Sequence, residues 1–398
     1  MVINMKKIAC ICLSVCLAMT LLCGCSKQNT KSNYSDDVVV EEIIVDDTSS
    51  GTDESSSNTE TPDVPSVDNS SADNSSVDNP SQNTSSKADP VSCSHSYDGG
   101  KVEQKAELFK AGTKKYTCTK CGDSYTSSCP VEKIKLLSIS NSFGKNALCE
   151  LPYICEQAGV KEVDIAIMYR SGCSLDQHWT NMQDPDNDAN KYTLYRYNSA
   201  DGKWTWSSDD AEAYNTPITT VFEEDWDVIM LQNSPTGAAN SQSFTNLSNV
   251  INYVSGKCPN AKILWHMTWA YQKDSQYLST YQNDDILMYD KIIECVKSEV
   301  IPNTKIHSVV PVGTAVMNTR TSKLKDRVHL ADGLHLSIDV GYYVAAFVWY
   351  THLTGQSFYD FPFKSGYSIV DENIDIIFES AENALSDPYE ITSSIYYR

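Results

Sequence analysis

The sequence predicts an α/β fold: a three-layer α/β/α sandwich around a central parallel sheet of about five strands. From residue 133 onward, short, largely apolar runs alternate with longer stretches of helical periodicity. Runs that are apolar on both faces are typical of strands covered on both sides, and intervening helices let consecutive strands lie parallel. The predicted strands are 135–140, 163–169, 227–232, 262–267 and 306–311.

Helices are expected between these strands. The periodic segments are 146–158, 241–256, 284–300 and 338–354, and Ser337 is placed to cap the last of them. In parallel sheets, the loops that leave the carboxyl ends of the strands form the ligand sites. Functional side chains are therefore expected directly after the strands.

The N-terminus has the layout of a secretion signal. Lys6 and Lys7 precede an apolar stretch at 8–22, which is too short to span a bilayer comfortably. It ends in Leu-Cys-Gly-Cys, which resembles the lipobox of bacterial lipoproteins and implies that Cys25 is acylated after cleavage. An ordinary signal peptide with incidental cysteines is the alternative. We expect an exported protein anchored to the outer face of the bacterial cytoplasmic membrane, with residues 1–25 as its signal.

Residues 26–92 are predicted to be a disordered tether. They are rich in Ser, Asn, Asp and Thr, in short near-repeats without apolar residues enough for a core. Residues 32–90 hold fourteen Asp and Glu against Lys87 alone, so most of the net charge of −21 belongs to this segment. The chain has no Lys/Arg-rich patch, and we expect no nucleic-acid partner.

Residues 93–130 form a small cysteine module. Cys118 and Cys121 have the two-residue spacing with which two thiolates bind one Zn²⁺, and Cys93 and His95 could complete a tetrahedral site. The module resembles zinc-ribbon-like modules. Two disulfides that include Cys129 are the alternative, and either would stabilise so short a segment. The cysteines of the larger domain are expected to be free and buried.

One serine and one histidine stand out in the larger domain, at 133–362. Ser142 follows the first predicted strand at the turn into a helix, where its hydroxyl can project from the sheet edge. A serine needs a base, usually a histidine oriented by a carboxylate, and His335 has Asp332 three residues before it. We expect Ser142, Asp332 and His335 to be the catalytic residues, whereas Ser138 and Ser140 lie within the strand.

Other strand ends offer hydrogen-bond donors for an oxyanion. Gly172 follows the second strand and permits close backbone approach, while Gln232 and Asn233 follow the third and carry side-chain amides. Together with the N–H of Ser142, these residues form the expected oxyanion hole. Which of the two amides completes it stays open.

This set of residues resembles the SGNH (GDSL-like) hydrolases, especially a bacterial branch described mainly as a domain of unknown function. The resemblance covers 134 to about 360 and implies a flavodoxin-like sandwich that hydrolyses esters without a cofactor. Ser142 matches the nucleophile, Gly172 the oxyanion glycine, and Asp332 with His335 the last block. Ser140 replaces a usual glycine, Asn141 stands where many members have Asp, and the third block lacks its usual Gly-x-Asn-Asp.

Aromatic residues suggest the substrate. An insertion at 176–220 is predicted to contain a hairpin in which Trp204 and Trp206 stack on sugar rings or pack onto the sheet. His266 and Trp269 follow the fourth strand near the predicted pocket, where they either bind substrate or belong to the core. With the surface anchor, these residues favour an esterase that removes acetyl or similar acyl groups from carbohydrate. A non-catalytic glycan- or peptide-binding protein is the alternative. Residues 363–398 are expected to be a C-terminal extension.

Overall fold

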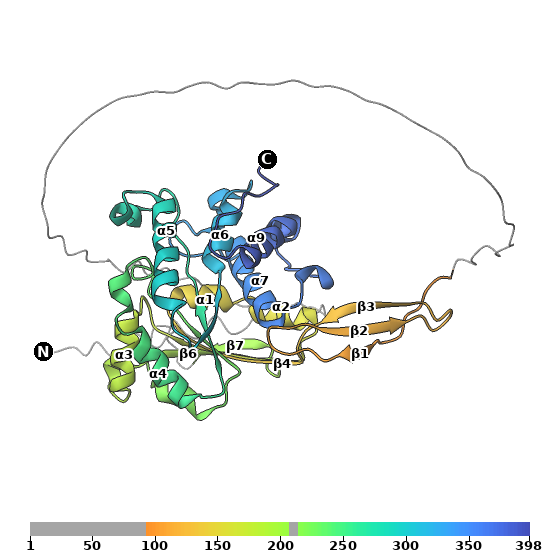
Figure 1. The fold of residues 1–398 in the computed structure, drawn as a ribbon, viewed down its shortest axis with the longest axis horizontal. Helices are drawn as coiled ribbons and strands as arrows, with labels where there is room; N and C mark the ends of the chain where they lie inside the picture. Colours follow the sequence, from red (N-terminus) through yellow and green to blue (C-terminus); the bar gives the residue numbers. More distant parts are fainter. Residues whose placement is uncertain (1–92, 207–213) are drawn as a thin grey trace, which may run out of the picture. The chain divides into compact units, whose positions relative to one another are not determined.

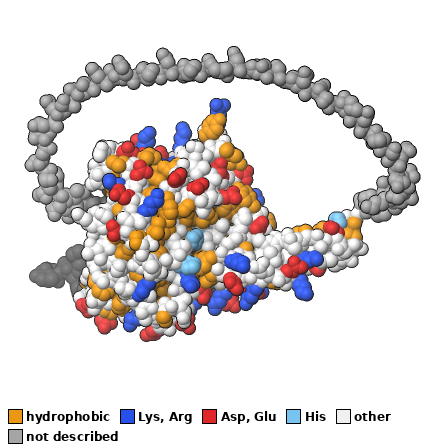
Figure 2. Space-filling view, viewed as in Figure 1, with side chains coloured by type: hydrophobic (Ala, Val, Ile, Leu, Met, Phe, Trp, Pro, Cys, Tyr) orange, Lys and Arg blue, Asp and Glu red, His pale blue; other side chains and the backbone are white. Residues whose placement is uncertain are grey.

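The computed structural model describes residues 93–206 and 214–398 (Figure 1). The predicted signal peptide, the lipobox residue Cys25 and the tether lie outside the described residues. No helix in the described ranges is both long enough and apolar enough to cross a membrane. Figure 2 shows charged side chains of both signs scattered over one face, with hydrophobic side chains gathered across its middle.

A seven-stranded sheet forms the centre of the large domain, in the order β10-β9-β8-β4-β5-β6-β7. The five predicted strands are present and parallel, and two further strands are antiparallel, so the expectation of about five was too low by two. The strands are β4 (Lys133–Ser140), β5 (Glu162–Tyr169), β6 (Thr193–Asn198), β7 (Lys203–Trp206), β8 (Val228–Leu231), β9 (Lys262–His266) and β10 (Ile306–Val310).

The two extra strands come from the predicted hairpin. β6 pairs with β7 around a turn at Gly202, whose φ of 62° lies in the left-handed region that glycine adopts readily. β6 also pairs antiparallel with β5, so the hairpin extends the main sheet. Tyr195, Tyr197 and Trp204 are buried, and the side chain of Trp206 lies outside the described residues.

Helices occupy the predicted segments, with shifted boundaries. The first predicted helix is two helices, the first of which begins at Ser142, because Pro152 sits near the start of the second. The N-cap of the last predicted helix is Asp339, while Ser337 Oγ accepts from the N–H of Gly341. The α-helices are α1 (Ser142–Leu148), α2 (Leu151–Ala158), α3 (Leu175–Gln183), α4 (Leu247–Lys257), α5 (Asp285–Cys295), α6 (Val312–Arg320), α7 (Val340–Thr354), α8 (Ser368–Glu372) and α9 (Ile374–Ser386).

Short helical turns connect these elements. The 3₁₀ turns are η1 (Asp188–Asn190), η2 (Ile218–Glu223), η3 (Ser241–Phe244), η4 (Gln276–Tyr281), η6 (Lys325–Val328) and η7 (Phe358–Asp360), and η5 (Val296–Val300) is a π-helical turn that continues α5.

The strand order reverses beside β4. From β4 the chain moves to β5 on one side, and later to β8, β9 and β10 on the other. Parallel crossovers are right-handed, so a helix that connects two strands in one direction along the sheet covers one face, and a helix that connects strands in the other direction covers the opposite face. α1 and α2, between β4 and β5, therefore lie on the face opposite α4 and α5, which connect β8, β9 and β10. α1 and α2 both contact α7, which is apolar on all sides and buried. A crevice at the carboxyl end of β4 is the expected ligand position for such a reversal.

The C-terminal segment belongs to the domain. α9 packs against α6 and α7, and the rings of Phe378 and Phe347 meet edge-on at 4.8 Å between centroids. Ile377 is fully buried. The predicted domain boundary at 362 is therefore wrong, because the apolar face of α9 covers part of the same core.

The cysteine module is a three-stranded antiparallel sheet of β1 (Lys101–Gln104), β2 (Gly112–Thr117) and β3 (Ser124–Cys129). It packs against the large domain through Phe109. The N–H of Phe109 donates to the carbonyl of Leu353 at 2.7 Å, and its ring lies 4.6 Å from that of His307. Gln356 Nε2 also donates to the carbonyl of Ser128 at 3.3 Å.

Candidate active site

The structure brings Ser142, His335 and Asp332 together. Ser142 Oγ lies 2.9 Å from His335 Nε2, and His335 Nδ1 lies 2.7 Å from Asp332 Oδ2. The three side chains are partly buried, and those of His335 and Asp332 are 26% and 16% exposed. This is the hydrogen-bond chain of nucleophile, base and orienting carboxylate that serine hydrolases use.

The end of β4 determines which serine reaches the histidine. Ser138 and Ser140 are fully buried, and their hydroxyls lie 2.6 Å apart. Asn141 caps α1 by accepting from the N–H of Phe143, and Ser142 is the first residue of that helix. A Cβ on Gly144 would overlap the Ser140 hydroxyl, so the absence of a side chain at 144 makes room for the serine at 140.

The loop of Asp332 and His335 fixes the histidine tautomer. Asp332 Oδ1 accepts from the N–H groups of Leu334 and His335 at 2.9 and 3.0 Å, which leaves Oδ2 for the ring. Burial raises the pKa of Asp332, but hydrogen bonds from the His335 ring and these N–H groups outweigh it and hold the pKa at about 2. The ionised carboxylate keeps the proton on Nδ1 and leaves Nε2 to accept from Ser142.

Two backbone N–H groups are available beside Ser142. Neither the N–H of Ser142 nor that of Gly172 has an acceptor among the residues that the structure describes. Gly172 is exposed and adopts a φ of 57°. Asn141 ties the two loops together, because its Nδ2 donates to the carbonyl of Cys173 at 3.1 Å. Asn141, which directly precedes Ser142, is thus hydrogen-bonded to Cys173, which directly follows Gly172.

The side chains of Gln232 and Asn233 have other roles than the predicted one. Gln232 Nε2 donates to Asn141 Oδ1 at 2.6 Å and to the carbonyl of Asn233 at 3.3 Å, so both amide hydrogens have acceptors. Asn233 Nδ2 donates to Ser243 Oγ, and its Oδ1 accepts from the N–H of Ser234. Both side chains are 1% exposed. The prediction that either contacts an oxyanion is wrong, since both build the loops beneath the site.

The predicted sugar-contacting residues are buried. His266 and Trp269 are 0% exposed, and burial lowers the pKa of His266 to about 3. Trp204 is 8% exposed and donates to the carbonyl of Cys149 at 3.1 Å. Of the two roles expected for these three residues, the structure supports packing in the core and contradicts substrate contact. The sequence contains no signal that separates a buried aromatic residue after a strand from an exposed one.

Sequence reasoning missed the role of Asn141, although it lies directly before Ser142. Its two amide atoms make four hydrogen bonds, to Phe143, Gln232, Cys173 and Asn233. These partners follow three different strands, β4, β5 and β8. A buried, fully bonded amide of this kind fixes the relative positions of the strand ends.

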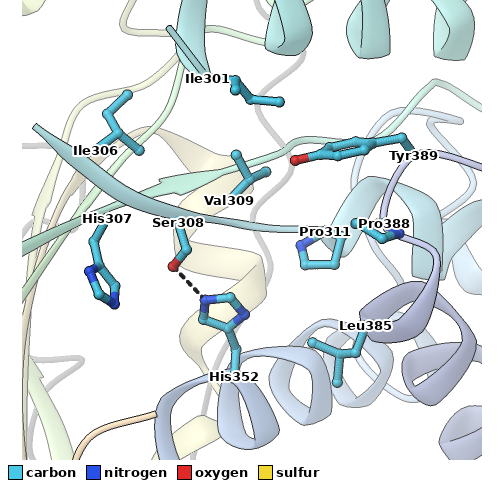
Figure 3. Close-up of a pocket in the computed structure, with 10 residues that line it drawn as sticks. All are labelled: Ile301, Ile306, His307, Ser308, Val309, Pro311, His352, Leu385, Pro388 and Tyr389. Carbon is cyan, nitrogen blue, oxygen red and sulfur yellow. Dashed lines mark hydrogen bonds between the residues drawn. The ribbon is translucent and has the colours of Figure 1, made fainter. Parts of the chain in front are cut away.

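A second serine–histidine pair lies at the sheet edge. Ser308 Oγ is 2.8 Å from His352 Nε2, in a pocket of about 380 Å³ along β10 (Figure 3). In the described part of the chain no carboxylate contacts His352, and burial lowers the pKa of its imidazole to about 4. The pocket is otherwise lined mainly by apolar side chains, including those of Val309, Leu385 and Tyr389. None of the Ser142 site residues lines it.

A second candidate site lies in the cysteine module. Ligand atoms of Cys93, His95, Cys118 and Cys121 all lie within 4.8 Å of one another. Burial raises the pKa of Cys118, but hydrogen bonds from the backbone N–H groups of Ser96 and Lys120 outweigh it and bring the pKa to about 5. Three thiols and one imidazole with such backbone support suit a tetrahedral Zn²⁺. Cys129 stands outside this group, and the described cysteines form no disulfide.

Comparisons with known proteins identify the family but no curated relative. A crystal structure of a DUF4886 family protein from Bacteroides uniformis is 27% identical, with a TM-score of 0.60 over 67% of this chain and 100% of that chain. A family 3 carbohydrate esterase from Clostridium thermocellum is 17% identical, with a TM-score of 0.31 over 63% of this chain and 98% of that chain. No curated protein matches. The family model described as "Domain of unknown function (DUF4886)" matches residues 135–384, and the chain therefore belongs to the DUF4886 family.

Proposed function

We propose that this protein is a serine ester hydrolase of the SGNH type, with Ser142 as nucleophile and His335 as base. One observation carries the proposal: the unbroken hydrogen-bond chain from Ser142 Oγ through the His335 ring to Asp332, at 2.9 and 2.7 Å. Ser142 and His335 lie 193 positions apart in the sequence and meet at the strand-order reversal where α/β sheets hold their ligands.

In the first half of the reaction, Ser142 Oγ attacks the ester carbonyl carbon and His335 Nε2 takes its proton. Asp332 stabilises the imidazolium through its hydrogen bond to Nδ1. The carbonyl oxygen, which becomes an oxyanion, accepts from the N–H groups of Ser142 and Gly172, since both lack another acceptor among the described residues. Collapse of the tetrahedral intermediate breaks the ester bond, and His335 gives its proton to the departing alcohol.

In the second half, water attacks the acyl group on Ser142. His335 Nε2 takes a proton from the water, and collapse of the second intermediate returns a proton to Ser142 Oγ and releases the carboxylic acid. The His335 ring suits both transfers, because it contacts Ser142 and is partly exposed, whereas Asp332 is less exposed.

We further propose acylated carbohydrate, with acetyl as the first candidate group, as the substrate class. The support is the surface anchoring predicted from Cys25. Buried Trp204, His266 and Trp269 add nothing to this proposal. A panel of acetylated polysaccharides, assayed for released acetate, identifies the polymer.

The test of the reaction type is hydrolysis of p-nitrophenyl acetate by the full chain. We expect a burst of nitrophenol followed by steady turnover. The matched variant is Ser308→Ala, which removes the other histidine-bonded serine and should leave the rate unchanged. A folded wild-type protein that never releases nitrophenol or acetate would contradict the proposal and favour a glycan- or peptide-binding protein on the same fold.

For the cysteine module we propose that Cys93, His95, Cys118 and Cys121 bind one structural Zn²⁺. The donor set and its 4.8 Å spread support this. Metal analysis should find about one Zn²⁺ per chain, lost in Cys121→Ser and retained in Cys129→Ser, whose thiol is outside the group. A chelator should lower the stability of the module while esterase activity changes by less than about twofold. Oxidised Cys118 and Cys121 without metal would support disulfides.

We also propose that the mature protein begins at Cys25, carries lipid there and faces outward from the bacterial cytoplasmic membrane. The lipobox-like residues before Cys25 support this. Intact mass of the native protein should show the lipid, and Cys25→Ser should abolish it. An unmodified, freely secreted chain would contradict the proposal.

A further inference from the structure

Trp269 lies between the two halves of the candidate site, and we propose that it is a positioning residue that holds Ser142 and His335 in register. The inference rests on the proposed function, since it concerns the same serine and histidine. Trp269 is 0% exposed, so it cannot contact a substrate. It acts through the residues next to each of the two reacting side chains.

The first connection is to the nucleophile. The indole of Trp269 stacks on the ring of Phe143, with centroids 4.0 Å apart and an angle of 7° between the planes. Phe143 directly follows Ser142 in α1, a helix of only seven residues. Parallel aromatic packing of this kind resists sliding and tilting of the first helical turn. The position of Ser142 is therefore coupled to the indole.

The second connection is to the base. Trp269 Nε1 donates to the carbonyl of Leu334 at 2.9 Å. Leu334 directly precedes His335, and its own N–H donates to Asp332 Oδ1 at 2.9 Å. The peptide that carries His335 is thus held by the indole on one side and by the carboxylate on the other.

The two connections converge on one rigid side chain. The edge of the Phe143 ring also meets the His335 ring, with 5.8 Å between centroids and a 70° angle between planes. Without Trp269, the short helix and the Asp332 loop would each keep their own local hydrogen bonds but could shift relative to one another. A misplacement of about 1 Å between reacting groups can cost about 10²-fold in rate. Trp269 should therefore matter for kcat and not for KM.

The main test compares Trp269→Phe with Trp226→Phe in the full chain. Trp226 is a matched control because it is also buried and its Nε1 also donates to a backbone carbonyl, that of Val221 at 2.6 Å. We expect Trp269→Phe to lower kcat about 10- to 100-fold with KM within about threefold of wild type. Trp226→Phe should leave kcat within about threefold of wild type, even if it lowers the melting temperature as much as Trp269→Phe does.

Two further variants separate the two connections. Benzothienylalanine, incorporated at 269 in place of Trp, keeps the bicyclic ring but replaces the N–H with sulfur, so it removes only the hydrogen bond to Leu334. Phe143→Leu removes the stack, together with the edge contact to the His335 ring, and keeps the hydrogen bond from Trp269 to Leu334. We expect each to lower kcat by less than Trp269→Phe does. Benzothienylalanine also keeps the test possible if Trp269→Phe does not fold, and kcat equal to wild type in a folded variant lacking the N–H would overturn that half of the inference.

A spectroscopic readout makes the inference independent of activity. With ¹⁵N-labelled histidine, the ring nitrogens of His335 in wild type should show one tautomer, protonated on Nδ1. Trp269→Phe should keep that tautomer but move the ¹⁵N resonance of Nε2 toward that of a nitrogen without a hydrogen bond, because Ser142 is displaced from it, and Trp226→Phe should not. If the wild-type protein hydrolyses no ester, the proposed function fails while this comparison still decides the positioning role. An unchanged Nε2 resonance together with unchanged kcat in Trp269→Phe would overturn the inference.

Discussion

Ser142 and Ser308 both lie within hydrogen-bond distance of a histidine Nε2 atom, at 2.9 and 2.8 Å, but the two pairs differ in their surroundings. His335 has an ionised carboxylate on its other nitrogen, whereas His352 contacts no carboxylate of the described residues. Ser142 begins a helix beside two available N–H groups, and Ser308 lies within an edge strand. The proposed catalytic role of Ser142 therefore rests on these surroundings and not on a serine–histidine contact alone.

The largest difference between the pairs should appear when each serine is removed. Ser142→Ala should lower kcat by about 10⁵-fold or more, because it deletes the nucleophile, and His335→Ala should do the same. The double variant should be scarcely worse than either, since the two act as a unit. Ser308→Ala should retain wild-type kcat. Steady-state hydrolysis of p-nitrophenyl acetate measures all four, and an active Ser142→Ala protein would reassign the site.

Removing the carboxylate should make the Ser142 pair more like the Ser308 pair. Asp332→Asn should lower kcat by about 10³- to 10⁴-fold, because an amide can stabilise the wrong imidazole tautomer and cannot balance the imidazolium. The same kinetic assay checks it, with circular dichroism to show that the fold is kept. Asp332→Asn activity within tenfold of wild type would mean that the carboxylate does not distinguish the two pairs.

Asn141 tests the importance of the available N–H groups. Asn141→Ala should lower kcat by about 10²-fold, because it frees the loop of Gly172 from the helix of Ser142 and weakens the oxyanion site. Asn233→Ala is the control, since it disturbs a neighbouring loop without touching that connection. Equal losses in the two variants would show a general effect of loop disruption.

The smallest effect is on stability in acid. The pKa of Asp332 lies near 2 in the folded protein, below its unfolded value near 4, so its contribution of about 2 kcal/mol is complete above pH 4 and is lost as pH falls toward 2. The stability difference between wild type and Asp332→Asn in urea should therefore shrink from pH 5 to pH 2.5. For Ser308→Ala against wild type, the difference should stay constant over that range.

The sequence predicted the elements of the fold well, because their signals are local. The five parallel strands lie where the apolar runs placed them, and the insertion at 176–220 contains the predicted hairpin, β6–β7. The addition of that hairpin to the sheet was not predictable, since pairing of β6 with β5 depends on contacts between distant segments. The C-terminal boundary failed for the same reason, because α9 completes a core formed mainly by earlier helices.

At the site, sequence reasoning located the residues whose candidate role follows from their chemical type and their place after a strand. It failed for residues whose role depends on where the side chain points. Ser142, His335 and Asp332 come together as expected. The amides of Gln232 and Asn233 point into the loops, and Trp269 faces the core. The direction of a side chain after a strand depends on what packs around it, and the sequence does not contain that information in local form.

The most direct measurement of the central claim is labelling of the full chain with a fluorophosphonate, followed by peptide mass mapping of the adduct. A fluorophosphonate reacts only with a serine that a neighbouring base activates, and both histidine-bonded serines are present in one molecule as an internal comparison. We predict one adduct, on Ser142, lost in His335→Ala and retained in His352→Ala. An adduct on Ser138, Ser140 or Ser308, or none on a folded protein, would contradict the account.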